Sequence, residues 1–344
     1  MESRRFLVLL THSSRPVELA ECDFDYLVRR YSAPQRLSGL PPLTELGSIE
    51  QHRHYVGGVS ILELNMDPKP SLRSFGFHNP GIKVQHATVA QDRLLVSLQD
   101  AIVVLDKFSD LSDRSMVDKG ALGRIDDPWF AGVHSACPLG ADACIIAASA
   151  PDAVLWVDLR RRRVARRQRL PADIYGRNYA LSSETDLREH FVTNDLQLGH
   201  VNWAWPHQDS VYISALIPGD IGRFSRDGGY QRLVTGFVGC HGVRITSDGQ
   251  QMYFADSTHG ALVLCTLDGS IRKTVQVRSK WLHDVQHVID DFFVFCVADH
   301  NRIDLIDVGR EEVFLSHSFD DVGQSLQFVS IIPIEGGRPS FIDE

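Results

Sequence analysis

Five histidines recur at the start of a repeated strand pattern along this 344-residue chain. Successive members are separated by 48, 66, 41 and 42 residues, and each opens a short apolar run that ends in a polar turn. The five are His86, His134, His200, His241 and His283. Neutral imidazole binds zinc, iron and copper, and three or four imidazoles are enough to hold one ion. We therefore expect these residues to hold a transition metal if the fold brings them together, with any surplus imidazole orienting a substrate or moving protons.

A structural role is the alternative for the same histidines. Duplication of a strand unit would carry along a histidine that hydrogen-bonds the backbone of the neighbouring unit. Five matched positions favour the metal or catalytic cluster, whereas a single one would favour the structural role.

The units that carry these histidines predict the fold. Residues 237–276, "GFVGCHGVRITSDGQQMYFADSTHGALVLCTLDGSIRKTV", contain four short strands separated by turns, and "WLHDVQHVIDDFFVFCVADHNRIDLIDV" repeats the layout. Short β-branched and apolar strands with Asp and Gly turns are typical of antiparallel blades. Units of about 40–45 residues predict an all-β protein, a β-propeller. We count six blades, with seven as the alternative because residues 1–80 have room for more strands.

The two ends of the chain are expected to share a blade. The last unit, "VGQSLQFVSIIPI", has Gln324 at the histidine position and stops after one strand, while "RRFLVLLTH" supplies a strand near the start. Pairing these strands would close the ring and remove a free sheet edge. We therefore treat residues 1–344 as a single domain, with 159–199 as an insertion or lid over one face. Within it, "LRRRRVARRQRL" alternates as an outer, solvated strand does.

The propeller geometry groups further polar residues with the histidines. The first strand of each blade lines the axis, so matching positions meet at one mouth of the channel. The turn between the second and third strands returns to the same face and brings Asp256, His259, Asp299 and His300 to its rim. Asp256 and Asp299 are candidate catalytic groups, although Asp and His are also common turn residues.

Three residues beside the histidines complete the predicted site, and two of them, Arg244 and Asn202, are candidate catalytic groups. Arg244 is placed to bind an anion or to pair with an acid between blades. Asn202 lies two residues after His200 and therefore on the same side of the strand. Trp203 would wall a pocket or pack between blades.

Composition excludes several classes of protein. The net charge of −9 argues against a general nucleic-acid surface. No apolar run approaches the ~20 residues of a membrane helix, and the short apolar start does not fit a signal peptide, so we expect a cytoplasmic protein without membrane contact. The six cysteines form no CxxC pair and are expected to be buried thiols. Dinucleotide, P-loop, α/β-hydrolase and zincin motifs are absent from the sequence.

Two stretches resemble known blades. "HGVRITSDGQQMYFADSTHGALVLCTLDG" and "LHDVQHVIDDFFVFCVADHNRIDLIDV" are similar to blades of the NHL and SMP-30-like six-bladed propellers. The axial histidines are similar to those of peptidyl-amidoglycolate lyases, a resemblance that implies zinc held by His134, His200, His241 and His283. Carotenoid cleavage oxygenases resemble the chain in holding iron with four axial histidines, but they have seven blades. Arylsulfotransferases carry a His-x-Asn that resembles His200-Val201-Asn202, yet the arginine expected after the next strand is missing from "YISALIPGD".

Together these patterns predict a metal-dependent enzyme that acts on a small molecule or modified peptide. The metal is expected to be zinc, iron or copper, and the chemistry a lyase or hydrolase reaction or an oxidation. A non-catalytic propeller that binds a ligand or protein is one alternative. Sulfate transfer through His200 is the other.

Overall fold

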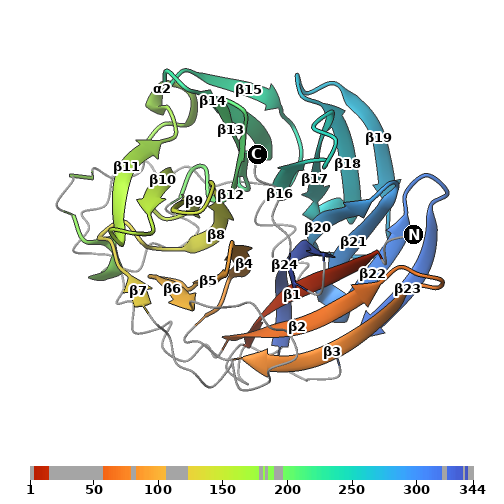
Figure 1. Cartoon of the computed structure of the whole chain (residues 1–344). Coiled ribbons are helices and arrows are strands. Elements are labelled where there is room, and N and C mark those ends of the chain that lie inside the picture. The colour runs from red at the N-terminus through yellow and green to blue at the C-terminus, as the bar shows by residue number, and fades with distance from the viewer. Residues whose placement is uncertain are drawn as a thin grey trace.

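The computed structural model describes residues 4–14, 57–78, 83–105, 123–177, 181–182, 185–189, 197–319, 324–335 and 338–339. The strands in these ranges form six small antiparallel sheets placed around a common axis (Figure 1). The helices found there are short: α2 (Ala172–Tyr175) and the 3-10 helices η5 (Leu187–Glu189), η7 (Ser257–His259) and η8 (Ala298–His300). No helix within these ranges has the length and apolar character needed to cross a lipid bilayer.

Five of the sheets, here called blades 2 to 6, are four-stranded and follow chain order. Blade 2 contains β4 (His86–Ala90), β5 (Arg93–Ser97), β6 (Ile102–Leu105) and β7 (Gly123–Ile125). Blade 3 contains β8 (Val133–Pro138), β9 (Ala143–Ala148), β10 (Ala153–Asp158) and β11 (Arg163–Arg169). Blade 4 contains β12 (Val201–His207), β13 (Ser210–Ala215), β14 (Asp220–Ser225) and β15 (Tyr230–Val234). Blade 5 contains β16 (Cys240–Ile245), β17 (Gln251–Asp256), β18 (Ala261–Thr266) and β19 (Ile271–Gln276). Blade 6 contains β20 (Leu282–Ile289), β21 (Phe292–Val297), β22 (Arg302–Asp307) and β23 (Glu312–Ser318).

Blade 1 joins the two ends of the chain. Its strand order is β25 (Arg338–Pro339), β24 (Gln324–Glu335), β1 (Arg5–Ser14), β2 (Gly57–Asn65) and β3 (Ser71–His78). The C-terminal strand β24 pairs antiparallel with the N-terminal strand β1, from Phe6 opposite Pro333 to Ser14 opposite Gln324. The predicted closure and the count of six blades are therefore confirmed, and the seven-blade alternative is wrong.

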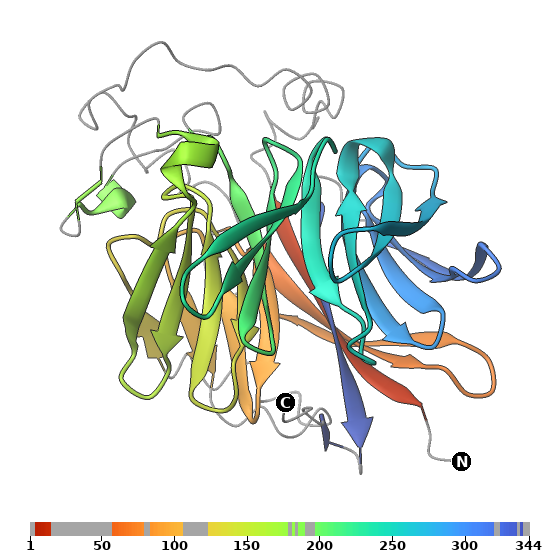
Figure 2. The same ribbon diagram turned by 90° about the horizontal axis from the view of Figure 1, so that it is seen from above.

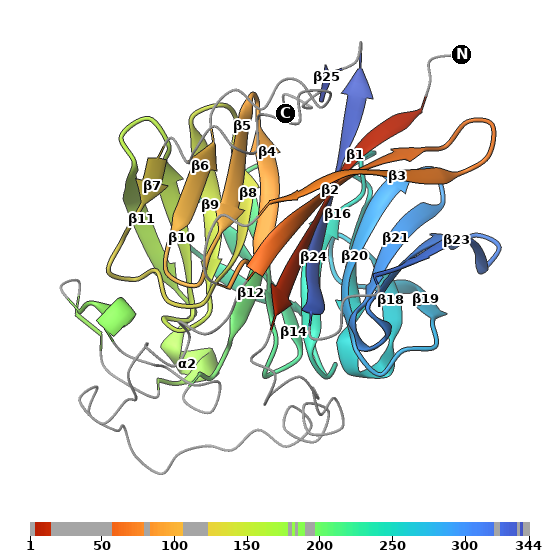
Figure 3. The ribbon, with the colours of Figure 1, turned by 90° about the horizontal axis from the view of Figure 1, so that it is seen from below.

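The inner strands complete the ring. Strands β24, β4, β8, β12, β16 and β20 contact one another in that order, and β20 returns to β24. Figures 2 and 3, each turned by 90° from the view of Figure 1, show the blades from the side, arranged around this axis. The protein is thus a six-bladed β-propeller, as the strand units predict.

The hydrophobic core lies between the blades. Six clusters of buried side chains occupy the six interfaces between neighbouring blades. Strand β9 illustrates the pattern, because Ile146 packs toward blade 2 while its neighbours Ile145 and Ala147 pack toward blade 4. Side chains of a strand point alternately to opposite faces, and here both faces are covered. The middle strands are therefore continuous apolar runs, such as "CIIAA" and "FVFCV".

The outer strands are polar because their sides face solvent. Strand β19 buries one of its six residues, Val275, and β11 buries none. Strand β11 belongs to blade 3, so the segment outside the blades begins after it and not at residue 159. Helix α2 anchors the described start of this segment: the Tyr175 hydroxyl lies 2.7 Å from that of Tyr230 on β15.

Closure by β24 leads to a test of stability. A chain ending at residue 319 would lack Leu326, Phe328 and Val329, which are fully buried. Each contributes about 1.5–3 kcal/mol, a sum comparable with the stability of a whole domain. We expect this chain to aggregate or to lack a cooperative transition in size-exclusion chromatography and thermal circular dichroism. A chain ending at residue 335 keeps β24 and should unfold as the full chain does; equal melting of all three would contradict this role of β24.

Candidate functional site

The five histidines lie at the beginnings of five inner strands. His86 opens β4, His200 directly precedes β12, and the others are the second residues of β8, β16 and β20. Two neighbouring pairs are in contact: the ring centroids of His134 and His200 are 4.8 Å apart, and those of His241 and His283 are 4.7 Å apart.

Phe328 of β24 is the aromatic ring that links these pairs. Its centroid lies 5.0 Å from His283, 6.2 Å from His241, 6.3 Å from His134 and 6.1 Å from His86. Blade 1 thus contributes a phenylalanine to the group. Gln324, predicted at the sixth histidine position, is the first residue of β24, four residues earlier.

His86 has a structural role. Its Nδ1 accepts a hydrogen bond from the Ala136 N–H of blade 3 (3.2 Å), and its Nε2 lies 2.8 Å from the Ser330 hydroxyl of blade 1. Both ring nitrogens are therefore used in contacts between blades. Burial, reinforced by the charge of Arg244, lowers the pKa of His86 well below its usual value and keeps the ring neutral. Among the five residues, this one fits the structural alternative.

His241 is held by one nitrogen only. Its Nδ1 lies 2.7 Å from the Ser257 hydroxyl and 3.1 Å from the Gly239 carbonyl oxygen, which can only accept. Nδ1 therefore carries the proton, and the lone pair is on Nε2. Burial lowers the pKa of His241 to about 4, although the bond to Gly239 acts in the opposite direction.

His134 and His200 have nitrogens without partners. Both Nδ1 atoms are buried and make no hydrogen bond within the described residues. Burial lowers the pKa of His200 to about 3 and that of His134 well below its usual value, and the charge of Lys83 acts in the same direction on both. Both rings are therefore neutral at physiological pH, and each has a buried polar atom that needs a partner.

An aspartate from blade 3 shapes the backbone at His200. Asp152 accepts hydrogen bonds from the N–H groups of Leu198 (3.2 Å), Gly199 (3.2 Å) and His200 (2.6 Å). His200 has φ of 50°, in the left-handed region that residues other than glycine rarely adopt. The Asp152 bonds stabilise this conformation, which sets the position of the imidazole next to His134.

The predicted rim residues form two carboxylate–imidazole pairs on η7 and η8. His259 Nδ1 lies 2.9 Å from Asp256, and His300 Nε2 lies 3.8 Å from Asp299. The His259 side chain is 63% exposed, so it is accessible from solvent, whereas Asp256 is buried. Burial raises the pKa of Asp256 against the influence of His259. Helix η7 also carries Ser257, so this rim is directly connected to His241.

Arg244 lies in the interior. Its guanidinium forms a two-pronged ion pair with Asp284 of blade 6, at 2.5 and 2.8 Å, and both side chains are fully buried. The Trp203 ring covers the guanidinium carbon at 3.8 Å. Arg244 therefore follows the second of its two predicted roles, a pairing between blades, and Trp203 is buried and packs inside.

Asn202 is also committed to structural bonds. Its amide N–H donates to the Cys240 carbonyl of blade 5 at 2.7 Å, and its oxygen accepts a hydrogen bond from Ser214 at 2.5 Å. The side chain is fully buried. The structure therefore places Asn202 and Arg244, two of the candidate catalytic residues, in the blade interfaces, and leaves Asp256 and Asp299 at the rim.

Imidazoles are suitable metal ligands, but the present arrangement does not bring three of them together around one point. In the part of the chain that the structure describes, no group of three or more His, Cys, Asp or Glu side chains lies in position to hold an ion. The histidines instead form two ring pairs, His134 with His200 and His241 with His283.

Four residues of this region were not predicted from the sequence: Phe328, Asp284, Ser257 and Lys83. Asp284 directly follows His283, and Ser257 directly follows Asp256, so the repeat pattern contained a signal for both. Nothing in the pattern distinguishes Phe328 from the other apolar residues of β24.

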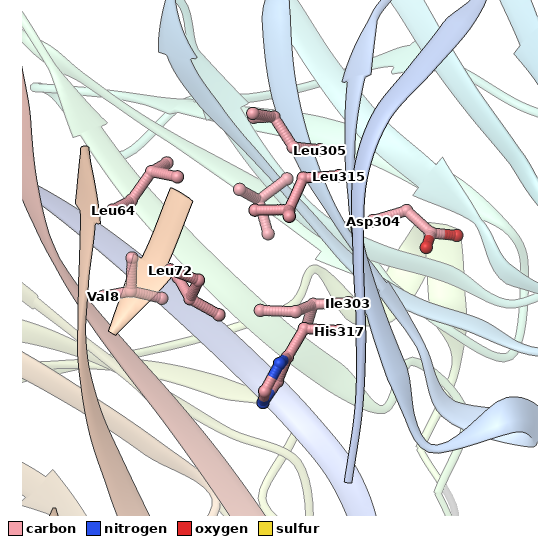
Figure 4. A pocket seen from close by; sticks show the side chains of 9 residues that line it. Val8, Leu64, Leu72, Ile303, Asp304, Leu305, Leu315 and His317 are labelled. Atoms are coloured by element: carbon pink, nitrogen blue, oxygen red, sulfur yellow. The ribbon is translucent and has the colours of Figure 1, made fainter. Parts of the chain in front are cut away.

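The cavity found among the described residues lies elsewhere. It is lined by Val8, Leu64 and Leu72 of blade 1 and by Ile303, Leu305, Leu315 and His317 of blade 6 (Figure 4). Its volume of about 10 Å³ is at the lower limit for one water molecule. This space is a packing gap between blades.

Comparison with known proteins supports the fold. No protein-family model matches the chain, and neither does any curated protein sequence. Among solved structures, a nidogen/laminin complex matches with a TM-score of 0.57 and 10% identity, covering 79% of this chain and 94% of that chain. A streptogramin B lyase matches with a TM-score of 0.51 and 13% identity, covering 77% and 80%. Virginiamycin B lyase from Staphylococcus aureus has a TM-score of 0.49, with 11% identity over 79% and 92%. At such identities the likeness defines the class of protein, a β-propeller, and no more.

The buried ion pair gives a stability prediction. Asp284→Ala would leave the Arg244 guanidinium buried without its counter-ion, which costs about 3–5 kcal/mol. Replacing both partners, as Arg244→Met with Asp284→Leu, removes the unpaired charge and should recover most of this loss. Urea unfolding of the three proteins measures the difference. A double variant as unstable as the single one would show that the lost hydrogen bonds to backbone, and not the unpaired charge, dominate.

The depressed histidine pKa values give a pH prediction. Burial lowers the pKa of His200 to about 3 and that of His241 to about 4 in the folded chain, whereas both have a pKa near 6.5 in the unfolded chain. The unfolded state therefore binds more protons below about pH 6.5, and stability falls as the pH falls. Each residue should contribute about 1.4 kcal/mol of loss per pH unit between pH 6 and pH 5. Urea unfolding of metal-free protein should show a shallower pH dependence in His200→Asn and in His241→Asn; an unchanged slope in both would contradict the assignment.

Proposed function

We propose that this propeller is a metal-dependent enzyme that acts on a small molecule or modified peptide at its histidine mouth. The observation that carries the proposal is the pair of buried, unpartnered Nδ1 atoms on His134 and His200, whose rings are 4.8 Å apart. Two neighbouring neutral imidazoles, each with a nitrogen that lacks a partner among the described residues, can offer lone pairs to one cation.

The low pKa values support ligand roles over proton abstraction. A base with a pKa of about 3 or 4 is a weak proton acceptor near pH 7, because catalytic bases work best near the operating pH. For a metal ligand the same shift is an advantage, since no proton competes with the ion. His134 and His200 would bind through Nδ1, and His241 through Nε2.

The surroundings of His241 match those of ligating histidines. Such residues usually donate their second ring N–H to a carbonyl or carboxylate, which fixes the tautomer and the ring orientation. The Gly239 carbonyl and the Ser257 hydroxyl occupy that position here. His283, in ring contact with His241, is the fourth candidate, whereas His86 has both nitrogens engaged.

Proton transfer is assigned to the rim. His259 is exposed, and Asp256 orients its ring at 2.9 Å. Asp256 ends β17 and His259 ends η7, on either side of the Ser257 that contacts His241, so the pair is connected to the histidine ring. A bound zinc, iron or copper ion would supply Lewis-acid catalysis, an activated water or oxygen chemistry.

The filled axis limits the substrate. Phe328, Trp203 and the Arg244–Asp284 pair are buried, and so are His86, His200, His241 and His283. We therefore expect a substrate to contact the rim first, which favours a small molecule or the end of a modified peptide.

A non-catalytic binding propeller is the second candidate. The open arrangement of the histidines favours it, because no ligand set of three or more is assembled among the described residues. The similar structures include both a streptogramin B lyase and a nidogen/laminin complex, so the fold is compatible with either class. Sulfate transfer has less support, because both polar ends of Asn202 are bonded inside the blades.

Metal titration tests the proposal. Metal-free protein is titrated with zinc, iron(II) and copper(II) by calorimetry, and its metal content after purification is measured by mass spectrometry. We expect close to one ion per chain and a stabilisation of about 2.7 kcal/mol at a hundredfold excess over Kd. The variant His134→Gln with His200→Gln should bind at least about 100-fold more weakly. The matched control, His207→Gln with His287→Gln, alters two histidines outside the mouth and should bind as the original protein does.

The outcomes separate the two candidates. Equal binding by the mouth variant and the control would overturn the metal site. Stoichiometric binding that His134→Gln with His200→Gln abolishes, combined with metal-dependent hydrolysis of p-nitrophenyl acetate, supports the enzyme. A chain that binds no ion, and whose melting temperature none of the three metals changes, is the non-catalytic propeller.

A further inference from the structure

An arginine surface lies on blade 3, away from the histidine mouth. Seven of the chain's 35 basic residues fall within ten positions, 160–169, although the whole protein has a net charge of −9. Most of these side chains are exposed. They are Arg160, Arg161, Arg162, Arg163, Arg166, Arg167 and Arg169, and we call this set the arginine surface.

The surface follows the outer edge of a sheet. Strand β11 is the outermost strand of blade 3 and, among the described strands, pairs with β10 only (Figure 1). Arg162 packs directly over Gly123 of β7 in blade 2. The Arg166 guanidinium lies beside Gly228, in the turn after β14 of blade 4, about 3.7 Å from where a Cβ atom on that glycine would be. The arginines therefore reach both neighbouring blades.

Local carboxylates neutralise part of the charge. Arg160 pairs with Asp142 at 2.9 Å, Arg161 with Asp158 at 3.2 Å, and Arg167 with Asp127 at 2.6 Å. Arg163 and Arg166 form no ion pair with any carboxylate of the described residues. The surface keeps an excess of positive charge, centred on these two exposed residues.

Arg166 is held in place without a carboxylate. Its guanidinium stacks over the Trp156 ring at 4.5 Å and donates a hydrogen bond to Gln168 at 3.4 Å. Stacking orients the planar group and leaves its edge for a ligand. It also covers the indole, which is then not available to stack on a nucleic-acid base.

We infer that the arginine surface binds an extended acidic segment of a partner protein. Guanidinium groups recognise carboxylates through paired hydrogen bonds. The seven residues of β11 span about 23 Å, the length of a similarly short extended peptide. The positive charges along an edge strand disfavour pairing with neutral or basic strands. An acidic segment carries the opposite charge and can therefore lie against this strand.

Nucleic acid fits this surface less well. Asp142, Asp158 and Asp127 lie among the arginines and would repel a continuous phosphate backbone, whereas a peptide can place its carboxylates between them. The strongly acidic remainder of the protein would repel a long polyanion beyond the patch. A short acidic peptide avoids both costs.

Fluorescence anisotropy on the full chain tests the inference. The probe is a fluorescein-labelled peptide of about eight residues, alternating glutamate and threonine, the approximate length of β11. We expect Arg163→Glu with Arg166→Glu to weaken binding at least about tenfold, because two attractive contacts become repulsive. The matched control, Arg272→Glu with Arg278→Glu, makes the same charge change on exposed residues at and after β19 of blade 5 and should change the affinity less than about twofold.

Three results would overturn the inference. They are no saturable binding at physiological ionic strength, equal weakening by both double variants, and tighter binding of a short DNA duplex than of the peptide. The last would assign the surface to nucleic acid. Circular dichroism of both variants should match that of the original protein, because all four arginines are exposed.

Discussion

The buried ion pair between Arg244 and Asp284 is the constraint on which the centre of this propeller depends. Asp284 accepts two bonds from the guanidinium and a third from the Val329 N–H of the closing strand β24. Arg244 in turn donates to the carbonyls of Val285 and Val329 and lies against Trp203. Blades 4, 5, 6 and 1 therefore meet at one pair of charges. Burial alone would lower the pKa of Arg244, but Asp284 and its hydrogen bonds outweigh it and raise the pKa, so the cation is retained. Gly242 belongs to the same arrangement: its φ is 63°, and a side chain there would collide with Asp284.

The histidine mouth rests on this filled centre. The Phe328 side chain lies among the histidines, and the imidazoles form pairs between neighbouring blades. Burial against these apolar groups, more than any single charge, lowers their pKa values. The site thus combines neutral, partly unsatisfied imidazoles with an exposed His259–Asp256 pair at the rim.

Much of the architecture was predictable because blades are local units. Each strand and turn of "CHGVRITSDGQQMYFAD" forms bonds within about 15 residues, so alternation and turn residues are visible in the sequence. Closure by β24 was predictable because an incomplete unit at one end matched surplus strands at the other. Residues 163–169 showed outer-strand alternation, yet the length of the 159–199 segment placed the insertion boundary too early. The choice between six and seven blades stayed undecided for a similar reason. Residues 1–80 contain no histidine unit that would fix the number of strands there.

The roles of individual side chains depend on contacts between distant blades. His86 and His200 have equivalent places in the repeat, but His86 meets Ser330 and Ala136, while the Nδ1 of His200 has no hydrogen-bond partner among the described residues. Arg244 finds Asp284 forty residues later, and Asn202 finds Cys240 in the next blade. The sequence by itself determined the repeated strand units and the residue types at their starts, because these follow from local periodicity. Tertiary structure alone decided which imidazole nitrogens are bonded and which have no partner among the described residues, because hydrogen-bond partners across blade interfaces are set by packing and leave no periodic trace in the chain.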